Sequence, residues 1–260
     1  MSTAPSYLGH DHPLITCMIQ ADNSARAIEL INKGHADGCD AFGFQQEVLP
    51  EQERDPQIIR RIFSAMQGKP IYVTNYRSKH NKGKTDEMLL EELCTLRQNG
   101  ATLIDIMGDF YAPHPIQLTE EADAVARQKE AIARIHDLGG EVLMSSHVMK
   151  FIPAEEVLRI ATAQQERGAD IAKIVTAAHS EEEEWENLRI TALLKKELKI
   201  PFLFLSGGSH TQLHRTVGPL LGCCTWLTVA EHDMYSTKQQ PLCKNIRLVA
   251  DQYQPSSFRE

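Results

Sequence analysis

Short apolar segments alternate with amphipathic stretches along almost the whole chain. The apolar segments are rich in valine, isoleucine, threonine and phenylalanine, which favour β-strands. The stretches between them begin at capping residues such as asparagine or threonine and often end at glycine, as helices do. This alternation predicts a parallel sheet whose strands are joined by helices. The predicted strands are 15–20, 40–45, 70–76, 102–107, 141–147, 170–176, 201–207 and 224–229.

The number of these units indicates the fold class. Eight β/α units in 260 residues fit a (β/α)8 TIM barrel, a single domain over residues 1–260. The alternative is an open doubly wound sheet, which would carry a Gly-x-Gly-x-x-Gly turn after an early strand; the sequence has none. Because barrel enzymes place their active sites at the carboxyl ends of the strands, polar residues there are the candidate functional groups.

Charge and composition narrow the classes of partner. The formal net charge is -8, whereas nucleic-acid-binding proteins are usually basic. The amino-terminal segment lacks the basic and apolar regions of a secretory signal, and no apolar run reaches the roughly 18 residues of a membrane helix. The six cysteines form no Cys-x-x-Cys pair, which is typical of reduced, buried thiols. We therefore expect a cytoplasmic protein with neither a nucleic-acid nor a membrane partner.

Lys173 stands in the middle of the predicted strand 170–176 among apolar neighbours. Side chains alternate along a strand, so Lys173 shares a face with Ile171 and Val175. If that face is the barrel interior, removal from water disfavours the charged form of an amine. A neutral amine can attack a carbonyl group and form a Schiff base. The alternative is a lysine that reaches water near the end of its strand.

Other polar residues follow the ends of the predicted strands. His147 ends strand 141–147 and suits proton transfer in both directions; the alternative is a hydrogen-bonded core histidine. Arg77 and Arg215 can each clamp a carboxylate, although a surface ion pair is the alternative for each. The basic segment 77–84 is either a solvated loop or a lid over an anionic substrate. No set of His, Cys, Asp and Glu has the spacing of a zinc site, so we expect no metal.

Several of these segments together resemble the type I 3-dehydroquinate dehydratases, the Schiff-base dehydroquinases of the shikimate pathway. The resemblance spans roughly residues 13 to 250 and is strongest in the second half of the chain. The segments that carry it are TNYRS, SSHVMKFIP, ADIAKIV, LSGGSHTQLHRTVGPLLG and YSTKQQP. In the fourth of these, an arginine follows the serine by nine positions, and glycines follow the arginine by three and seven.

The resemblance implies a carbon–oxygen lyase that converts 3-dehydroquinate to 3-dehydroshikimate in aromatic amino acid biosynthesis. Lys173 would be the Schiff-base nucleophile, and His147 would remove and return protons. The substrate would be a small carboxylate, no organic cofactor or metal is needed, and a homodimer is a family-level expectation. The predicted substrate-binding residues are Arg77, Arg215, Ser236, Gln240, Gln45 and Asn81.

The sequence also departs from the family pattern. Gly43 and Gln45 stand where the family has the Glu and Arg that end its second strand. Asn81 stands where the family has the Glu that orients the catalytic histidine. Val148 and Met107 replace two further acidic residues. Either the chain keeps dehydroquinate activity, with Glu47 replacing a lost carboxylate, or it is a divergent paralogue that acts on a related hydroxy-keto acid.

Two other functions stay open from the sequence. The segment FLFLSGG resembles the strand end that holds phosphate in class I aldolases, which would imply a phosphorylated sugar bound by the backbone of Gly207 and Gly208. The losses at Gly43, Gln45 and Asn81 would also fit a non-catalytic barrel that binds a small molecule.

Overall fold

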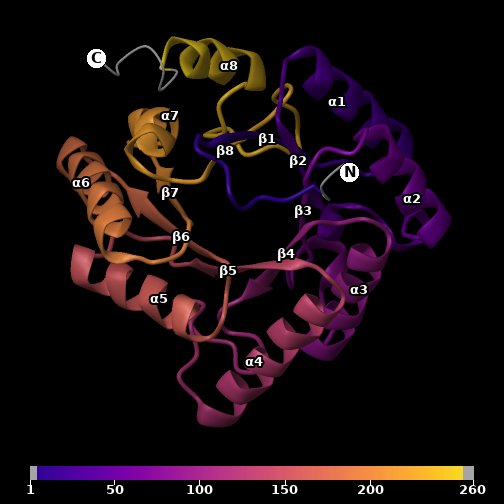
Figure 1. Cartoon of the computed structure of the whole chain (residues 1–260), viewed down its shortest axis with the longest axis horizontal. Helices are drawn as coiled ribbons and strands as arrows, with labels where there is room; N and C mark the ends of the chain where they lie inside the picture. Colours follow the sequence, from indigo (N-terminus) through magenta and orange to yellow (C-terminus); the bar gives the residue numbers. More distant parts are fainter. Residues whose placement is uncertain (1–4, 254–260) are drawn as a thin grey trace. The chain divides into compact units, whose positions relative to one another are not determined.

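The computed structural model describes residues 5–253, in which strands and helices alternate (Figure 1). Each of the predicted strands forms. The first strand pairs in parallel with the second and the eighth, the second with the third, and the sixth with the fifth and the seventh. The strand order is β7-β6-β5-β4-β3-β2-β1-β8. The eightfold repeat of strand and helix with this order is the (β/α)8 TIM-barrel fold, so the predicted fold class is confirmed. The strands are β1 (Leu14–Ile19), β2 (Ala41–Gln45), β3 (Ile71–Thr74), β4 (Leu103–Met107), β5 (Glu141–His147), β6 (Ile171–Ala178), β7 (Phe202–Gly208) and β8 (Thr225–Thr228).

Several of the helices begin where a capping side chain accepts a hydrogen bond from a backbone N–H group of the first turn. Asn23 accepts a hydrogen bond from the N–H of Arg26, and Ser180 accepts one from the N–H of Glu183. Short 3-10 helices cover 46–48, 51–53 and 79–81. The α-helices are α1 (Ser24–Ala36), α2 (Pro56–Ala65), α3 (Asp86–Gln98), α4 (Ala122–Asp137), α5 (Ala154–Glu166), α6 (Glu181–Glu197), α7 (Gln212–Leu221) and α8 (Cys243–Gln252).

The described chain divides into two compact units. The first unit contains residues 5–103 and 225–253, and the second contains residues 104–224. In the first unit, the side chain of Thr225 on β8 hydrogen-bonds Thr16 on β1 at 2.8 Å, and β1 pairs with both β8 and β2. In the second unit, β6 is buried along its whole length between β5 and β7.

Gly43 on β2 has a packing reason within the first unit. A Cβ atom at this position would lie 2.1 Å from Sδ of Met18 and 3.3 Å from the Tyr72 ring. Gly43 is the register partner of Met18 on β1 and of Tyr72 on β3. The thioether and the ring therefore occupy the space that a larger side chain at position 43 would need.

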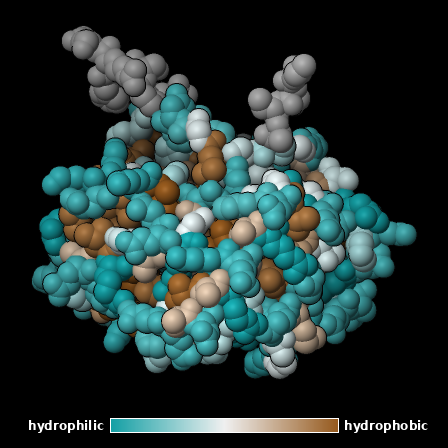
Figure 2. Space-filling model, turned by 60° about the horizontal axis from the view of Figure 1, so that its bottom comes forward, coloured by the Kyte–Doolittle hydropathy of each residue, from teal (hydrophilic) through white to brown (hydrophobic). Residues whose placement is uncertain are grey.

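The surface exposes few large apolar side chains. Figure 2 shows hydrophobic residues as separate small patches among hydrophilic ones on the face that it draws. Among the exposed apolar residues are Met149, Trp185 and Met234. In the part of the chain that the structure describes, no helix combines the length and apolar character needed to cross a membrane.

Candidate active site

Lys173 lies beside a buried carboxylate. Its Nζ is 3.2 Å from Oδ2 of Asp105, which β4 contributes. The side chains of Lys173 and Asp105 are 5% and 0% exposed, so the ion pair is removed from water. The Ser145 hydroxyl donates a 2.5 Å hydrogen bond to the other carboxylate oxygen, Oδ1. A buried charge is costly unless it is paired and hydrogen-bonded, so these contacts offset the cost of burying a lysine at this position.

The contacts of neighbouring residues show which face of the sheet carries the amine. Ser145 is the register partner of Lys173, and its hydroxyl reaches the same aspartate. The next residue, Ser146, points to the other face, where its Oγ accepts a 3.0 Å hydrogen bond from Gln164 on α5. Successive side chains on a strand point to opposite faces. The Lys173 amine therefore points away from α5, as the alternation along its strand predicts, and does not lie among the helices.

The backbone of Lys173 is held by the side chain of Gln164. The Lys173 N–H donates to Oε1 of Gln164, and Nε2 of Gln164 donates to the Lys173 carbonyl, both at 3.0 Å. Gln164 is fully buried on α5, and its amide also contacts Ser146. This double contact fixes the strand segment from which the lysine projects, because displacing either residue would leave a buried polar group unsatisfied.

His147 ends β5 on the strand next to Lys173. Its Nδ1 lies 2.7 Å from Oε1 of Gln117, and its backbone N–H donates to the same oxygen at 3.0 Å. Burial lowers the pKa of His147 to about 3; the nearby charge of Lys173 also lowers this pKa, while Asp105 opposes the shift. The imidazole is therefore neutral over the physiological pH range.

Arg215 belongs to the same unit as Lys173 and His147. It lies on α7, and its Nε donates a 2.7 Å hydrogen bond to the carbonyl of Ser206 on β7. The side chain is buried, and burial lowers the pKa of Arg215 to about 10. A buried guanidinium held at a strand end is suited to bind a carboxylate through paired hydrogen bonds.

The remaining predicted residues belong to the first unit. Arg77 forms a bidentate ion pair with Asp86, with Nε and Nη2 each 2.7 Å from a carboxylate oxygen. Asn81 is fully buried; its Nδ2 donates to Oδ1 of Asn75 and to the carbonyl of Tyr76, both at 2.8 Å. The Oδ1 of Asn81 accepts a 2.7 Å hydrogen bond from Arg54.

The end of β2 carries the residues that replace the family's Glu-x-Arg. The side-chain oxygen of Gln45 accepts a hydrogen bond from Nε2 of Gln20. Glu47 is buried and accepts a hydrogen bond from the Thr74 hydroxyl, 3.0 and 2.9 Å from its two carboxylate oxygens. A buried carboxylate is thus present in this segment, as the hypothesis for Glu47 requires, and whether it contacts substrate stays a prediction.

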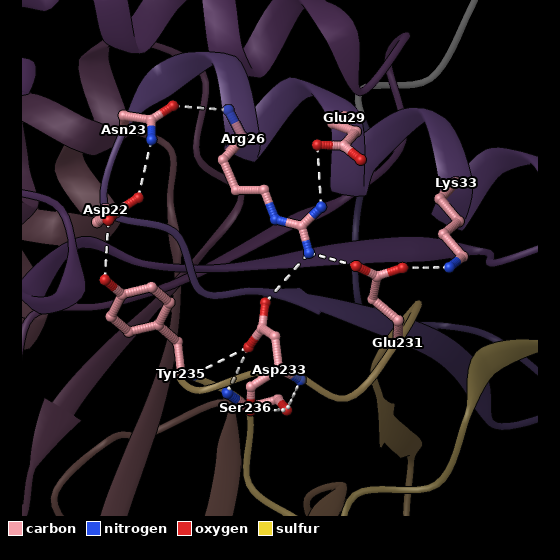
Figure 3. A network of polar contacts seen from close by, with 9 residues as sticks. All are labelled: Asp22, Asn23, Arg26, Glu29, Lys33, Glu231, Asp233, Tyr235 and Ser236. Atoms are coloured by element: carbon pink, nitrogen blue, oxygen red, sulfur yellow. Dashed lines mark hydrogen bonds and ion pairs between the residues drawn. The ribbon is translucent and has the colours of Figure 1, made fainter.

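Ser236 and Gln240 lie on the segment 229–242 between β8 and α8. The Ser236 hydroxyl accepts a 2.8 Å hydrogen bond from the N–H of Asp233, and Oδ1 of Asp233 accepts one from the N–H of Ser236 at 2.9 Å (Figure 3). Oε1 of Gln240 accepts a hydrogen bond from the N–H of Thr237 at 3.3 Å. These local contacts give the segment a defined turn conformation.

Ion pairs join this segment to α1. Figure 3 shows Arg26 between Glu29 on its own helix and Glu231 and Asp233 on the segment 229–242. Lys33 also pairs with Glu231, and the Arg26 and Lys33 contacts lower the pKa of Glu231 to about 2. Arg26 is therefore the side chain that most directly connects α1 to the segment that carries Ser236.

Sequence reasoning missed Asp105, Gln117 and Gln164. Asp105 carried the same signal as Lys173, a charged residue inside an apolar strand. Gln117 and Gln164 carried no such signal, because a glutamine in a loop or on a helix is ordinary. Within residues 5–253, no three His, Cys, Asp or Glu side chains are placed to hold a metal ion.

The fold and this site together describe a (β/α)8 enzyme with a buried lysine and a neighbouring histidine. The family model for type I 3-dehydroquinase matches residues 15–254. The chain therefore belongs to the type I 3-dehydroquinase family, which confirms the resemblance seen in the sequence. The predicted enzyme class, a carbon–oxygen lyase, is confirmed by this membership.

Relatives and solved structures agree with this family. The chain is 24% identical over 188 residues to a 3-dehydroquinate dehydratase of Aromatoleum aromaticum, covering 70% of this chain and 67% of the relative. It is 28% identical over 211 residues to one of Lactiplantibacillus plantarum, covering 78% and 76%. The crystal structure of 3-dehydroquinate dehydratase from Geobacillus kaustophilus matches with a TM-score of 0.79 at 17% identity, covering 97% of this chain and 94% of that one. An aldolase called QR15 matches less well, with a TM-score of 0.57 at 11% identity over 94% and 97%.

Proposed function

We propose that this chain is a Schiff-base-forming dehydratase that converts 3-dehydroquinate to 3-dehydroshikimate. The observation that carries the proposal is the buried Lys173 amine beside Asp105, with His147 at the end of the adjacent strand. A lysine removed from water is a candidate nucleophile toward a ketone, and a neutral imidazole is a candidate proton carrier.

The reaction follows from these two groups. Lys173 gives up one proton, and its amine adds to the substrate ketone. One proton is taken up when the added oxygen leaves as water, and an iminium ion remains. The iminium withdraws electrons, so His147 can remove a proton from the adjacent carbon and leave an enamine. The enamine then expels the hydroxyl group one carbon further on, which takes the proton back from His147 and departs as water. Hydrolysis of the remaining iminium releases the unsaturated ketone and restores the amine, so the net change is the loss of one water.

Asp105 supports the cationic states of this sequence. Its carboxylate faces Nζ of Lys173 at 3.2 Å and is held by Ser145. A protonated lysine and the iminium of the intermediate both carry positive charge at this nitrogen. A buried carboxylate at this distance stabilises both far more than it would in water.

The predicted substrate-binding residues keep these roles in the proposal. Arg215, held by the Ser206 carbonyl, is assigned to the substrate carboxylate. Arg77 is oriented by Asp86, and Ser236 and Gln240 lie on the segment tied to α1. Gln45 and Asn81 are the remaining residues proposed to bind the substrate. A cytoplasmic location is also proposed, supported by the six free cysteines, and a homodimer is proposed from the family resemblance.

The proposal is tested by trapping the covalent intermediate. Borohydride added during turnover of 3-dehydroquinate should reduce the iminium, and mass spectrometry should place the adduct on Lys173. Lys173→Ala should lose both adduct and turnover, whereas Lys150→Ala, which removes an exposed lysine beyond β5, should keep both. An adduct in the Lys173→Ala variant, or unaltered turnover, would refute the covalent mechanism.

The same experiment separates the dehydratase from a paralogue with another substrate. Gly43 and Gln45 alter the end of β2 relative to the family pattern, and Gln45 is hydrogen-bonded to Gln20. If dehydroquinate gives no adduct but a related hydroxy-keto acid is trapped on Lys173, the chemistry stands and the substrate assignment fails. Binding without any adduct would instead support a non-catalytic barrel.

A further inference from the structure

We propose that Gln117 is the positioning residue that sets the tautomer of His147, in place of the carboxylate that the family uses. The inference rests on the proposed function for its catalytic meaning, but the geometry concerns the free enzyme. Gln117 comes from the connection between β4 and α4, whereas the family's orienting Glu would stand at position 81, which is Asn here.

Two contacts to one atom determine which ring nitrogen carries the hydrogen. The backbone N–H of His147 can only donate, so the side-chain atom of Gln117 that it meets at 3.0 Å must be the carbonyl oxygen. The same Oε1 lies 2.7 Å from Nδ1 of the ring. Since an amide oxygen can only accept, Nδ1 must donate to it. The neutral ring is therefore the Nδ1–H tautomer, and Nε2 is its basic nitrogen.

Gln117 is itself held in place by its backbone. Its carbonyl accepts a 2.7 Å hydrogen bond from the Ser146 hydroxyl, the residue before the histidine. Its N–H donates to the carbonyl of His114 at 2.8 Å, and its φ of 47° is in the left-handed region. Gly108 permits this approach, because a Cβ there would lie 2.6 Å from the Gln117 carbonyl oxygen. The chain thus maintains an uncommon backbone conformation that brings this amide to the ring.

A buried arginine ties down the rest of this connection. Arg167, at the end of α5, donates to the carbonyls of Gly108 and Thr119 at 2.9 and 2.5 Å. It also donates to Oε1 of Gln128 at 2.8 Å, and Gln128 in turn donates to the Gly108 carbonyl at 3.1 Å. The ends of the connection that carries Gln117 are therefore fixed to α4 and α5 by charged and amide hydrogen bonds.

Asn81, at the family's orienting position, has other contacts within its own unit. Both hydrogens of its amide go to Asn75 and to the Tyr76 carbonyl, and its oxygen accepts from Arg54. These contacts engage the groups with which a side chain would orient an imidazole. The loss of the carboxylate at position 81 and the presence of an acceptor at position 117 are therefore mutually consistent.

Exchanging a carboxylate for an amide changes the electrostatics of the histidine. An amide oxygen orients the ring as a carboxylate does but brings no negative charge to stabilise the imidazolium. The charged groups that act on the ring are Lys173 on β6 and Asp105 on β4, which oppose each other. A carboxylate at position 117 would add a negative charge beside Nδ1, so it should raise the pKa of His147.

The decisive measurement is nitrogen NMR of the histidine rings in the free enzyme, with His147 assigned from the spectrum of His147→Gln. Wild-type enzyme should show the Nδ1–H tautomer. Gln117→Met, which has a similar length but no acceptor, should lose this preference, and kcat should fall by about 10²-fold, the lower limit for loss of a general base. Gln117→Glu, which keeps an acceptor oxygen, should show the Nδ1–H tautomer and retain most of the wild-type kcat. It should also raise the pKa of His147 above the wild-type value. Gln57→Met on the exposed start of α2 is the matched control and should change none of these values.

The outcomes separate this inference from the proposed function. An Nε2–H ring in wild-type enzyme, or unchanged kcat in Gln117→Met, would overturn the role of Gln117. Borohydride trapping on Lys173 should persist in Gln117→Met, because the amine and Asp105 are untouched. If no variant, wild type included, forms the adduct, the dehydratase assignment fails, while the tautomer measurement still decides the role of Gln117.

Discussion

His214 should make the folded chain sensitive to mild acid. The residue is 1% exposed on α7, and its ring packs edge-on against Phe204 at 5.1 Å between centroids. The Thr191 hydroxyl donates to the Asn187 carbonyl, so it accepts from Nε2 of His214 at 2.9 Å. Nδ1 has no hydrogen-bond partner among the residues that the structure describes. Protonation would therefore place a buried charge at an unsatisfied nitrogen beside Arg215.

The sign and size of the effect follow from proton linkage. Burial, with a smaller contribution from the charge of Arg215, lowers the pKa of His214 to about 3. An unfolded histidine has a pKa of about 6.5, so between these values the unfolded chain binds a proton that the folded chain does not. The contribution of the neutral ring to stability is complete above pH ~6.5 and is lost as the pH falls, by about 1.4 kcal/mol per pH unit. Between pH 7 and pH 5 the loss is about 2 kcal/mol from this residue.

Urea unfolding at pH 7 and pH 5 measures this loss. His214→Gln keeps an amide donor for Thr191 but has no group that titrates in this range. Between pH 7 and pH 5, the variant's loss of free energy of unfolding should be smaller than the wild-type loss by about 2 kcal/mol. His80→Gln removes an exposed histidine and should behave as wild type. If His214→Gln loses as much stability as wild type over this interval, the assigned burial of a neutral ring is wrong.

Three further variants test other contacts. Asp105→Asn removes the carboxylate that faces Lys173 at 3.2 Å. The free energy of unfolding at pH 7 should fall by about 3 kcal/mol or more, as it does when other buried ion pairs lose one partner. A loss below ~1 kcal/mol would show that the pair is not buried as described. Gln164→Leu leaves the backbone N–H and carbonyl of Lys173 without their side-chain amide partner. The free energy of unfolding should fall by about 1–3 kcal/mol, and amide hydrogen exchange in β6 should accelerate. Unchanged exchange would contradict the role of Gln164 in holding this strand. Arg26→Met removes the ion pairs of Arg26 with Glu231 and Asp233 and so loosens the segment 229–242, although Lys33 still pairs with Glu231. KM for dehydroquinate should rise about fivefold, equivalent to ~1 kcal/mol, with a smaller change in kcat. Arg189→Met, which removes an exposed pair on α6, should leave KM unchanged, and equal KM values in both variants would argue against the Arg26 contact.

The order of strands and helices could be predicted because its signals are local. Runs such as DAFGFQ and EVLMSSH have apolar residues at their centre, and β2 and β5 form within them. The starts of helices could be predicted equally well, since the capping side chains of Asn23 and Ser180 act within three residues. These patterns depend on chain periodicity and near-neighbour hydrogen bonds, which the sequence displays directly.

The candidate site could be predicted only in part from such local signals. Lys173 and His147 could be singled out because polar residues inside or at the end of apolar strands are conspicuous. The packing that requires a glycine at position 43 could not, because Met18 lies 25 residues away and meets it only through strand pairing. A departure from the family pattern looked like a loss in the sequence, whereas the structure shows the space occupied.

The sequence by itself determined the fold class and the two residues on which the proposed chemistry depends. Only the tertiary structure decided which groups surround them: Asp105 is 68 residues from Lys173, and Gln117 is 30 residues from His147. The physical reason is that secondary structure follows from short-range patterning, whereas the tautomer of an imidazole and the partner of a buried amine depend on hydrogen bonds between distant segments. Those bonds exist only once the chain has folded and a loop has adopted the conformation that presents an amide oxygen to the ring.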